Sequence, residues 1–584
     1  MESRAGSRSI AGSTEMLEAC VRLRWTLLVL AVGCASSSPP KAVATPAAKA
    51  PPPAPPVPAS VLTLAQGAQP FDDLGTLSRP VTTASPEAQR YFDQGLRLAY
   101  GFNHDEATRS FARAAELDPG CAACLWGVAW TLGPNYNVPM LPDRAQAAWD
   151  ALQTARERAS RGGPLEQALI SALATRYRGP EPVDPPGQQP MNEAFATAMR
   201  ALATAHPDDD DVQVIFAESL MDVNPWHLWT LDGKPAPGTE EIVATLERVL
   251  ARNPHHPGAN HYYIHAVEAS ANPGRAVPSA ERLPALMPAA GHIVHMPAHI
   301  FQRVGRYADA SEANRRAVRA DEAYLSKTKP PGYYPMYLGH NHGFLAYSAS
   351  MLGRSEESLR AARAATKALP PEMLDMMPGM DFFASEPLLV MVRFGKWKDV
   401  LAEPRPPAKY PTLTGLWLHA QGMALASTGK TREAAATMRE LRALATQVPP
   451  DLMAGQTPAS AMCRLGADAI EARIAERARK WKPAIAAWQR AVVQEDGFAY
   501  DEPADWFYPM RHYLGAALLD ARKPKEAEAV YREDLRRNAN NGWALHGLAS
   551  SLAAQGKKDE AAAARTRFEE AWKEADITLT RTAL

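Results

Sequence analysis

Histidines crowd one stretch of this 584-residue chain, where nine of the fifteen fall between residues 255 and 342. Two HxxxH pairs, His261 with His265 and His295 with His299, lie 34 residues apart. Side chains four residues apart share one face of a helix, so each pair would point in one direction. Imidazole nitrogens are common ligands of copper, zinc and iron. The spacing predicts a metal site built from neighbouring helices.

The segments that must hold these histidines have the sequence character of helices. Beyond residue 85 the chain is rich in Ala, Leu, Glu and Arg, and it shows little β-type alternation. Small and large apolar residues recur at matching positions near both ends of this region, as Tyr91, Gly95, Leu98, Ala107, Phe111, Ala114 and Pro119, and again as Leu514, Gly515, Leu518, Ala527 and Tyr531. Ala561 follows Ala527 by 34 residues. The spacing indicates repeated helix-turn-helix units.

This pattern resembles the tetratricopeptide repeat (TPR) family over most of residues 85–575. The resemblance implies an all-α fold for residues 85–584, in which helix pairs stack into a superhelical solenoid with a concave side. Between residues 142 and 252 the matches weaken and Pro-rich and aromatic stretches intervene, so we expect interrupted repeats there. The family's usual role is to bind proteins or peptides in its groove, which makes a scaffold one predicted function.

The repeat register predicts where the histidines lie. With Ala310 at repeat position 20, one unit begins at Gly291 and the next begins at Gly339. By resemblance to the family, positions 2, 5 and 9 of the first helix in each unit face the groove. Six of these nine positions in three successive units are histidines, and they are the predicted metal ligands: His261, His265, His292, His295, His299 and His340. Copper or zinc suits such a ligand set, and iron is open if a carboxylate joins.

Other residues near the predicted ligands have candidate roles. Glu268 lies one turn beyond His265 and is a candidate ligand or general base. His256 is expected at the rim, and the insertion at 323–337 would be either a lid or an ordinary connection. Three further residues are predicted to line a substrate pocket: Tyr262, Tyr347 and His342.

Three functions therefore remain open from the sequence. The first is a metalloprotein with redox or hydrolytic activity, the second is a scaffold without chemistry, and the third is a metal carrier or store. Groove histidines could also hydrogen-bond a peptide or satisfy buried polar atoms. Six histidines at matching repeat positions nevertheless favour a metal-binding role. Their number matches the ligands of coupled dinuclear copper proteins, a similarity of count alone.

The N-terminal residues predict export. Arg22 and Arg24 precede a short apolar run at 25–32, too short to span a bilayer, and the ending LAVGC resembles a bacterial lipobox. The resemblance, shared with exported bacterial TPR lipoproteins, implies a signal peptide at 1–34 and a lipid on Cys34, with an uncleaved helix or a plain secretory signal as alternatives. Residues 35–84 contain a Pro/Ala tract and are predicted to be a disordered spacer. We expect a bacterial envelope protein that contacts the membrane through this anchor.

Charge and cysteine content narrow the possible partners. The 63 basic and 64 acidic residues give a net charge of -1, which argues against a nucleic-acid partner. Five cysteines are too few for a disulfide scaffold. Cys121 and Cys124 form a CxxC pair, for which a local disulfide is the prediction and a redox or metal role the alternative.

Three further motifs have structural interpretations. The STGKT sequence at 427–431 lacks the first glycine of a phosphate loop and is predicted to be a turn between helices. The acidic run at 208–211 is predicted to cap a helix. Residues 500–512, dense in aromatic and charged side chains, are predicted to pack at a helix start, with a second binding surface as the alternative.

Overall fold

The computed structural model describes residues 54–330, 333–376 and 378–583. Helices dominate this part of the chain, as predicted, and the only named strands in it form a two-residue hairpin. No described helix combines the length and apolar character that crossing a bilayer requires. The predicted signal peptide at 1–34 and the predicted lipid attachment residue Cys34 lie outside the described residues.

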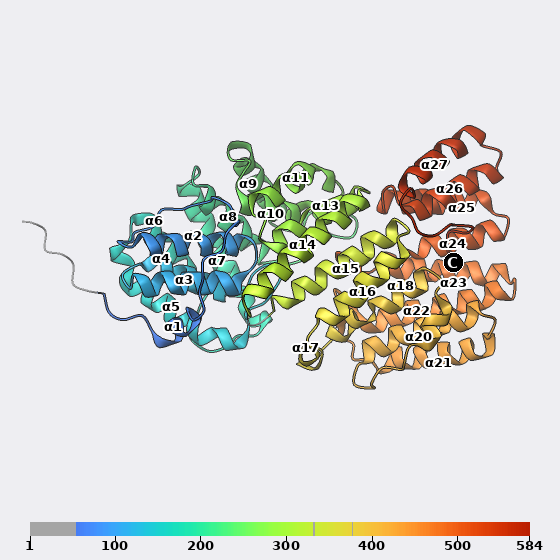
Figure 1. The fold of residues 1–584 in the computed structure, drawn as a ribbon, viewed down its shortest axis with the longest axis horizontal. Helices are drawn as coiled ribbons and strands as arrows, with labels where there is room; N and C mark the ends of the chain where they lie inside the picture. Colours follow the sequence, from blue (N-terminus) through green and yellow to red (C-terminus); the bar gives the residue numbers. More distant parts are fainter. Residues whose placement is uncertain (1–53, 331–332, 377, 584) are drawn as a thin grey trace, which may run out of the picture. The chain divides into compact units, whose positions relative to one another are not determined.

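The N-terminal half consists of helices joined by connections of varied length, shown from blue to green in Figure 1. Their bounds are α1 (Ala59–Leu64), α2 (Pro86–Tyr100), α3 (His104–Leu117), α4 (Ala122–Leu132), α5 (Ala145–Arg158), α6 (Pro164–Ala174), α7 (Pro185–Ala205), α8 (Asp210–Met221), α9 (Thr239–Arg252), α10 (Pro257–Glu268), α11 (Val277–Leu286), α12 (Gly291–His295), α13 (Pro297–Arg303) and α14 (Tyr307–Lys327). Three short 3-10 helices join them: η1 (Pro142–Arg144), η2 (Ala159–Arg161) and η3 (Pro273–Ala276).

The C-terminal half continues the same architecture. Its helices are α15 (Pro335–Met351), α16 (Ser355–Ala368), α17 (Pro371–Met376), α18 (Glu386–Arg393), α19 (Trp397–Ala402), α20 (Pro411–Ser427), α21 (Thr431–Gln447), α22 (Ala459–Arg477), α23 (Trp481–Asp496), α24 (Met510–Asp520), α25 (Pro524–Arg537), α26 (Gly542–Ala554) and α27 (Lys558–Ala571). The 3-10 helix η4 (Met380–Ser385) precedes α18, and strands β1 (Met453–Ala454) and β2 (Thr457–Pro458) pair antiparallel before α22.

Consecutive helices pack in pairs, and the repeat residues explain why. The Phe111 ring lies against Gly95 of its own pair and Gly127 of the next helix, where a Cβ on either glycine would overlap the ring. Near the C-terminus the Tyr531 ring lies in the same way between Gly515 and Gly547. Glycine is needed at these places because helix backbone and aromatic ring approach so closely. The fold is therefore a TPR-type helical solenoid, as the spacing predicted.

The folded region begins earlier than the predicted boundary at residue 84. The Pro/Ala tract ends at Pro58, and the sequence ASVLTL that follows forms α1, which packs against α3 and α5. Val61 is fully buried there, and Leu74 is buried further along. The disordered-spacer prediction is thus wrong for residues 54–84, because apolar side chains after the proline tract join the core. Residues 35–53 lie outside the described part.

The weakly matching region 142–252 contains long helices separated by irregular segments, as predicted. Between α8 and α9 the chain runs through an extended loop held by an isolated bridge between Trp229 and Pro235. Asp209 caps α8 by accepting a hydrogen bond from the Val212 amide, which confirms the capping role of the acidic run. Cys121 and Cys124 are joined in a disulfide at the start of α4.

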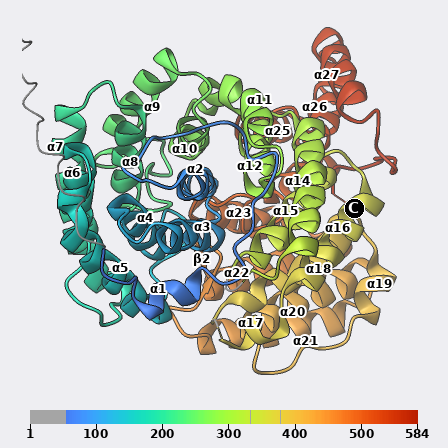
Figure 2. The same ribbon diagram turned by 60° about the vertical axis from the view of Figure 1, so that its left-hand side comes forward.

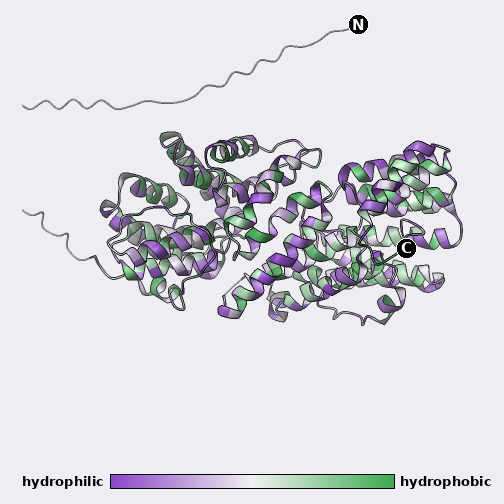
Figure 3. Ribbon diagram, turned by 45° about the horizontal axis from the view of Figure 1, so that its top comes forward, coloured by the Kyte–Doolittle hydropathy of each residue, from purple (hydrophilic) through white to green (hydrophobic). Residues whose placement is uncertain are grey.

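The histidine-bearing helices lie where two hydrophobic cores meet. One core reaches from Val57 to Phe344, and the other reaches from Tyr307 to Ala583. Figure 2 shows α12, α14 and α15 side by side at this junction, and contacts join all three. Most helices contain both hydrophilic and hydrophobic residues (Figure 3). Helix α10 stands out because all twelve of its residues are buried. A helix surrounded by protein on every side that also carries four polar residues is unusual and points to a site.

Candidate metal centre

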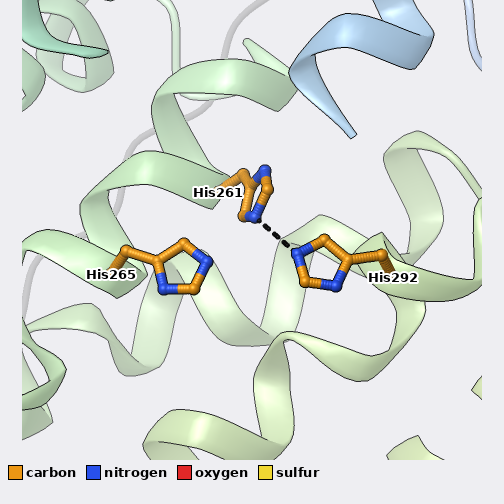
Figure 4. A group of neighbouring side chains, drawn as sticks. All are labelled: His261, His265 and His292. Atoms are coloured by element: carbon orange, nitrogen blue, oxygen red, sulfur yellow. Dashed lines mark hydrogen bonds between the residues drawn. The ribbon is translucent and has the colours of Figure 1, made fainter. Parts of the chain in front are cut away.

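The structure brings the six predicted histidines into two groups of three. Group 1 consists of His261, His265 and His292, and Figure 4 shows their rings facing one another. Group 2 consists of His295, His299 and His340. Within each group one candidate ligand atom per residue lies within 4.8 Å of the others. The sequence left the number of ions open, and the structure arranges the six histidines as two neighbouring groups of three.

In group 1, two of the three rings each have their Nδ1 atom in contact with a protein acceptor. His261 Nδ1 lies 2.6 Å from the Tyr100 carbonyl oxygen, and His265 Nδ1 lies 3.0 Å from Glu268 Oε1. These contacts place the ring hydrogen on Nδ1 and leave each Nε2 with a lone pair. His261 Nε2 lies 3.2 Å from His292 Nε2. Orientation of a ligand ring through its second nitrogen is characteristic of metal-binding histidines.

Group 2 repeats this arrangement with three Nε2 atoms. His295 Nε2 lies 2.8 Å from His299 Nε2 and 3.1 Å from His340 Nε2. His295 Nδ1 lies 2.6 Å from Asn314 Oδ1, while the Asn314 amide nitrogen donates to the Ala310 carbonyl. The amide oxygen is thus the atom that faces the ring, and His295 keeps its hydrogen on Nδ1.

The nitrogen separations fit shared ions. Two imidazole nitrogens bound at about 2.0–2.1 Å to one ion, in tetrahedral or trigonal geometry, lie roughly 3.3–3.6 Å apart. The closest nitrogen pairs, His261–His292 at 3.2 Å, His295–His340 at 3.1 Å and His295–His299 at 2.8 Å, fall a few tenths of an ångström below this range. A small outward movement of the rings would bring these closest pairs into the range of a shared ion.

Glu268 connects the two groups. Its Oε1 contacts His265 of group 1, and its Oε2 lies 2.8 Å from His299 Nδ1 of group 2. Glu502 Oε2 approaches the same Nδ1 atom to 2.9 Å. The ring centroids of His265 and His299 are 5.5 Å apart, so the groups are immediate neighbours. Glu268 therefore supports ligands of both groups, and it also forms a third possible ligand set with His265 and His299.

The electrostatics differ between His299 and the other rings. Burial and the neighbouring imidazoles hold the pKa values of His261, His292 and His295 well below the usual range. Burial lowers the pKa of His340 to about 3. Burial alone would also lower the pKa of His299, but Glu268 and Glu502 outweigh it and raise the pKa to about 10. Burial also lowers the pKa of His265. Five rings are thus neutral, the form in which imidazole can act as a metal ligand, while His299 holds a proton that a metal would displace.

A cavity of about 380 Å³ opens onto both groups; we call it the histidine cavity. Its lining includes His265 and His292 of group 1, and His299 and His340 of group 2. The insertion at 323–337 contributes Tyr333 and Tyr337 to its wall, and the Tyr337 ring lies 4.6 Å from the His292 ring. Tyr333 and Tyr337 of this insertion therefore form part of the site.

Five of the six histidines are too buried to face an open groove, and His340 is partly buried. His261, His265, His292, His295 and His299 are each no more than 3% exposed. The groove prediction is wrong in this respect, because irregular segments outside the repeats cover the first helices of these units. The Tyr136 ring packs against His265 in a tilted orientation and the Trp226 ring packs against it edge-on. Glu502 comes from the loop between α23 and α24.

Three residues predicted for the substrate pocket do not line the histidine cavity, and His256 is not at its rim. Tyr262 is buried against Phe102, and His342 is half-buried on α15. Tyr347 lines a different cavity. His256 is buried and caps α10, where its Nδ1 accepts from the Ala259 amide.

Two residues that orient the ligands escaped the sequence reasoning. Asn314 lies four residues after Ala310, the position that Phe111 and Tyr531 occupy in other repeats, so a polar residue there was a usable signal. Glu502 belongs to the segment 500–512, whose density of charged and aromatic residues was noticed but interpreted as helix packing. This segment contributes part of the cavity wall.

Comparisons with known proteins give limited information. No family model matches the sequence, and no curated protein matches it significantly. Among solved structures, the human IFIT1 dimer with PPP-AAAA is similar at 15% identity and a TM-score of 0.32, covering 83% of this chain and 89% of that chain. The human IFIT1 dimer with m7Gppp-AAAA is similar at 14% identity and a TM-score of 0.31, covering 84% and 91%. Likeness at this level carries no argument about function.

The fold and the site together define a class of protein. It is a TPR-type helical solenoid whose interior, at the junction of two cores, contains two groups of three histidines beside a cavity. Helical repeats are widely used for protein binding, but this chain places its distinctive residues inside the fold.

Proposed function

We propose that this protein binds two transition-metal ions, one in each histidine group, and uses them as an enzyme acting on an organic molecule in the histidine cavity. The observation that carries the proposal is the convergence of Nε2 atoms in group 2 while the opposite ring nitrogens of His295 and His299 face protein acceptors. Copper and zinc are the ions that suit imidazole ligands best.

The open coordination position favours catalysis over storage. Catalytic metal sites commonly use three protein ligands and keep a further position for water or substrate, whereas structural sites are closed by four. Each group offers three histidines, and each has two members on the wall of the histidine cavity. A ligand entering the cavity could therefore reach the open position of either ion. Redox chemistry is favoured if the ions are copper, and hydrolysis if they are zinc.

Burial also weighs against the scaffold alternative. A protein partner in a solenoid groove needs exposed residues to contact, and the histidines at the groove positions of α10 and α12 are buried. The same burial makes an uncompensated cluster of six imidazoles costly, because each needs a proton, a hydrogen-bond partner or an ion. The buried nitrogens His265 Nε2 and His292 Nδ1 have no hydrogen-bond partner in the described structure.

The deciding experiment is metal analysis of the full chain, purified without a histidine tag and loaded with copper or zinc. We expect about two equivalents of one metal after removal of loosely bound ions. Less than about 0.3 equivalents of any transition metal after attempted loading would contradict the proposal. Azide or cyanide binding, followed by spectroscopy of the copper-loaded protein, separates an open reactive centre from a closed storage site.

We also propose that the chain is exported and anchored through a lipid on Cys34. The support is the sequence LAVGC after a short apolar run, together with the disulfide between Cys121 and Cys124, which suits an oxidising compartment. Mass spectrometry of the mature N-terminal peptide tests this proposal. A diacylated or triacylated cysteine at position 34 is expected, and an unmodified peptide containing residues before Cys34 would contradict it.

A further inference from the structure

The walls of the histidine cavity are unusually rich in aromatic rings. They come from four separate parts of the chain: the loop after α8, the start of α15, η4 and the loop before α24. The residues are Trp226, Tyr333, Tyr337, Phe382, Phe383 and Phe507. Aromatic faces bury a large apolar area and attract cations through their quadrupoles. The cavity volume of about 380 Å³ lies in the range of sites for small organic ligands.

The charged groups of the cavity wall, apart from the histidines, are all acidic. Four carboxyl groups line it: Glu386, Asp501, Glu502 and Asp505. Among the described residues that line the cavity, none is a lysine or an arginine. The one cationic group on the wall, the protonated His299, is already paired with Glu268 and Glu502. An anionic ligand would therefore meet carboxyl groups without a free cationic partner, whereas a cationic ligand would be attracted. The wall therefore discriminates by charge as well as by shape.

Three of these carboxyl groups already have partners. Glu502 lies beside His299, and Asp505 accepts hydrogen bonds from the Thr457 hydroxyl and the Gln456 amide. Asp501 interacts with Asp505. These groups are parts of the protein's own network, so they are less available to a ligand.

Glu502 and Asp505 also have buried oxygens without a hydrogen-bond partner, but each of these carboxyl groups is held through another contact. Glu386, the first residue of α18, has no such contact among the described residues. Its Oε2 atom is buried and has no hydrogen-bond partner in the described structure, and no ion pair involves this carboxyl group. Burial raises the pKa of Glu386 to about 8, which reflects a carboxyl group that has lost water without gaining a protein partner. Such a group gains most when a cationic ligand supplies the missing partner.

We infer that the histidine cavity takes an organic amine, with an aromatic or alkyl body packed against the cavity's rings and an ammonium group paired with Glu386. The statement that this amine is a substrate rests on the proposed metal enzyme, because the metal groups would provide the chemistry. The statement that the cavity binds an organic amine depends only on the residues that line the cavity. The site excludes carboxylic acids of the same size through its acidic wall.

Ligand binding by the full chain tests the inference. Metal is removed with a chelator so that an amine cannot bind simply as a metal ligand, and titration calorimetry at pH 8 follows three probes of similar size. The probes are 2-phenylethylamine, 2-phenylethanol and 3-phenylpropionate. The amine is expected to bind at least about 10-fold more tightly than the alcohol, and the acid to bind most weakly. Equal or tighter binding of the alcohol or the acid would overturn the inference.

Matched variants locate the binding site. Glu386→Gln should remove most of the preference for the amine over the alcohol, whereas Glu240→Gln, an exposed carboxyl group on α9, should leave it unchanged. Phe383→Ala should weaken the binding of all three probes, because Phe383 lines the cavity. If E386Q does not fold, the F383A result decides: unchanged binding of every probe would show that they bind elsewhere.

Metal analysis of the same preparations keeps this inference separate from the proposed function. Protein that prefers the amine but binds no metal would support the ligand assignment and contradict the metal centre. Protein that binds metal without preferring the amine would support the metal centre and contradict the ligand assignment.

Discussion

His295 Nε2 and His299 Nε2 face each other at 2.8 Å, although the Nδ1 atom of each ring already faces a protein acceptor. Two lone pairs at this separation would repel, so something positive must lie between them. In the metal-free protein that charge is a proton on His299, because Glu268 and Glu502 raise its pKa to about 10. A metal ion bound by group 2 would replace this proton, as is usual when histidines become ligands.

Single substitutions should separate the two groups. His340→Ala removes a ligand of group 2 only, and His261→Ala removes a ligand of group 1 only. Each variant should lose about one of two metal equivalents, measured by elemental analysis of untagged protein. His342→Ala, on the same helix as His340 but outside both groups, is the control and should retain both ions. Unchanged metal content in H340A and H261A would show that the ligands are other residues.

Simultaneous replacement of His265 and His299 by Ala should abolish metal retention altogether. These residues belong to different groups, and both contact Glu268. Circular dichroism should show helical content close to that of the unaltered chain, because the repeats themselves do not depend on the metal. Retained metal in this double variant would contradict the ligand assignment.

Asn314 should affect metal affinity without touching the ion. Its side-chain oxygen accepts from His295 Nδ1, and Asn314→Leu would free the ring to rotate and leave that nitrogen without a partner. Loss of such an orienting contact typically lowers metal affinity about 10–100-fold. Competition with a chromophoric chelator measures the change. Asn314→Asp keeps an acceptor oxygen and should restore most of the affinity. Equal impairment of N314D and N314L would show that acceptance from His295 Nδ1 is not what supports metal binding.

The close approach of Gly291 to Asp321 should be essential for placing α12. A Cβ at position 291 would overlap Asp321 Oδ1, which itself accepts a hydrogen bond from the Tyr334 hydroxyl. Gly291→Ala should therefore displace α12 with its two ligand histidines and reduce metal content. Gly163→Ala is the matched control, because a Cβ there meets no atom within 4 Å. Full metal content in G291A would show that α12 tolerates the displacement.

Glu386 should make stability depend on pH. Burial raises its folded-state pKa from 4.5 to about 8, so the folded chain holds this proton more tightly than the unfolded chain. The resulting stabilisation is complete below about pH 4.5 and is lost as the pH rises through about 8. Between pH 5 and 8 the melting temperature of metal-free protein should fall more steeply than that of Glu386→Gln. Parallel curves for the two proteins would contradict the assignment.

The repeat period predicted the fold and the convergence of the six histidines. His261 and His295 lie one repeat apart, so stacking of identical units places them side by side without further information. The Phe111 packing against Gly95 followed from the same period. These features are local or periodic, which is why a single sequence contains them.

The burial of the site could not be predicted in this way. It depends on segments outside the repeats, such as those that bring Tyr136, Trp226 and Glu502 to the histidines. Their sequences have no period, and their positions depend on long-range packing that one sequence does not reveal. The sequence therefore indicated an open groove where the structure has buried histidines beside a cavity. The same limitation led to Tyr347 being assigned to the wrong cavity.

The most direct test of the central claim is the anomalous difference map of a crystal of the metal-loaded chain, measured at the absorption edge of the bound metal. Two peaks are predicted, one near the facing nitrogens of group 1 and one about 2.0–2.1 Å from the Nε2 atoms of His295, His299 and His340. A map without peaks at either histidine group, or with peaks only at surface residues, would contradict the account.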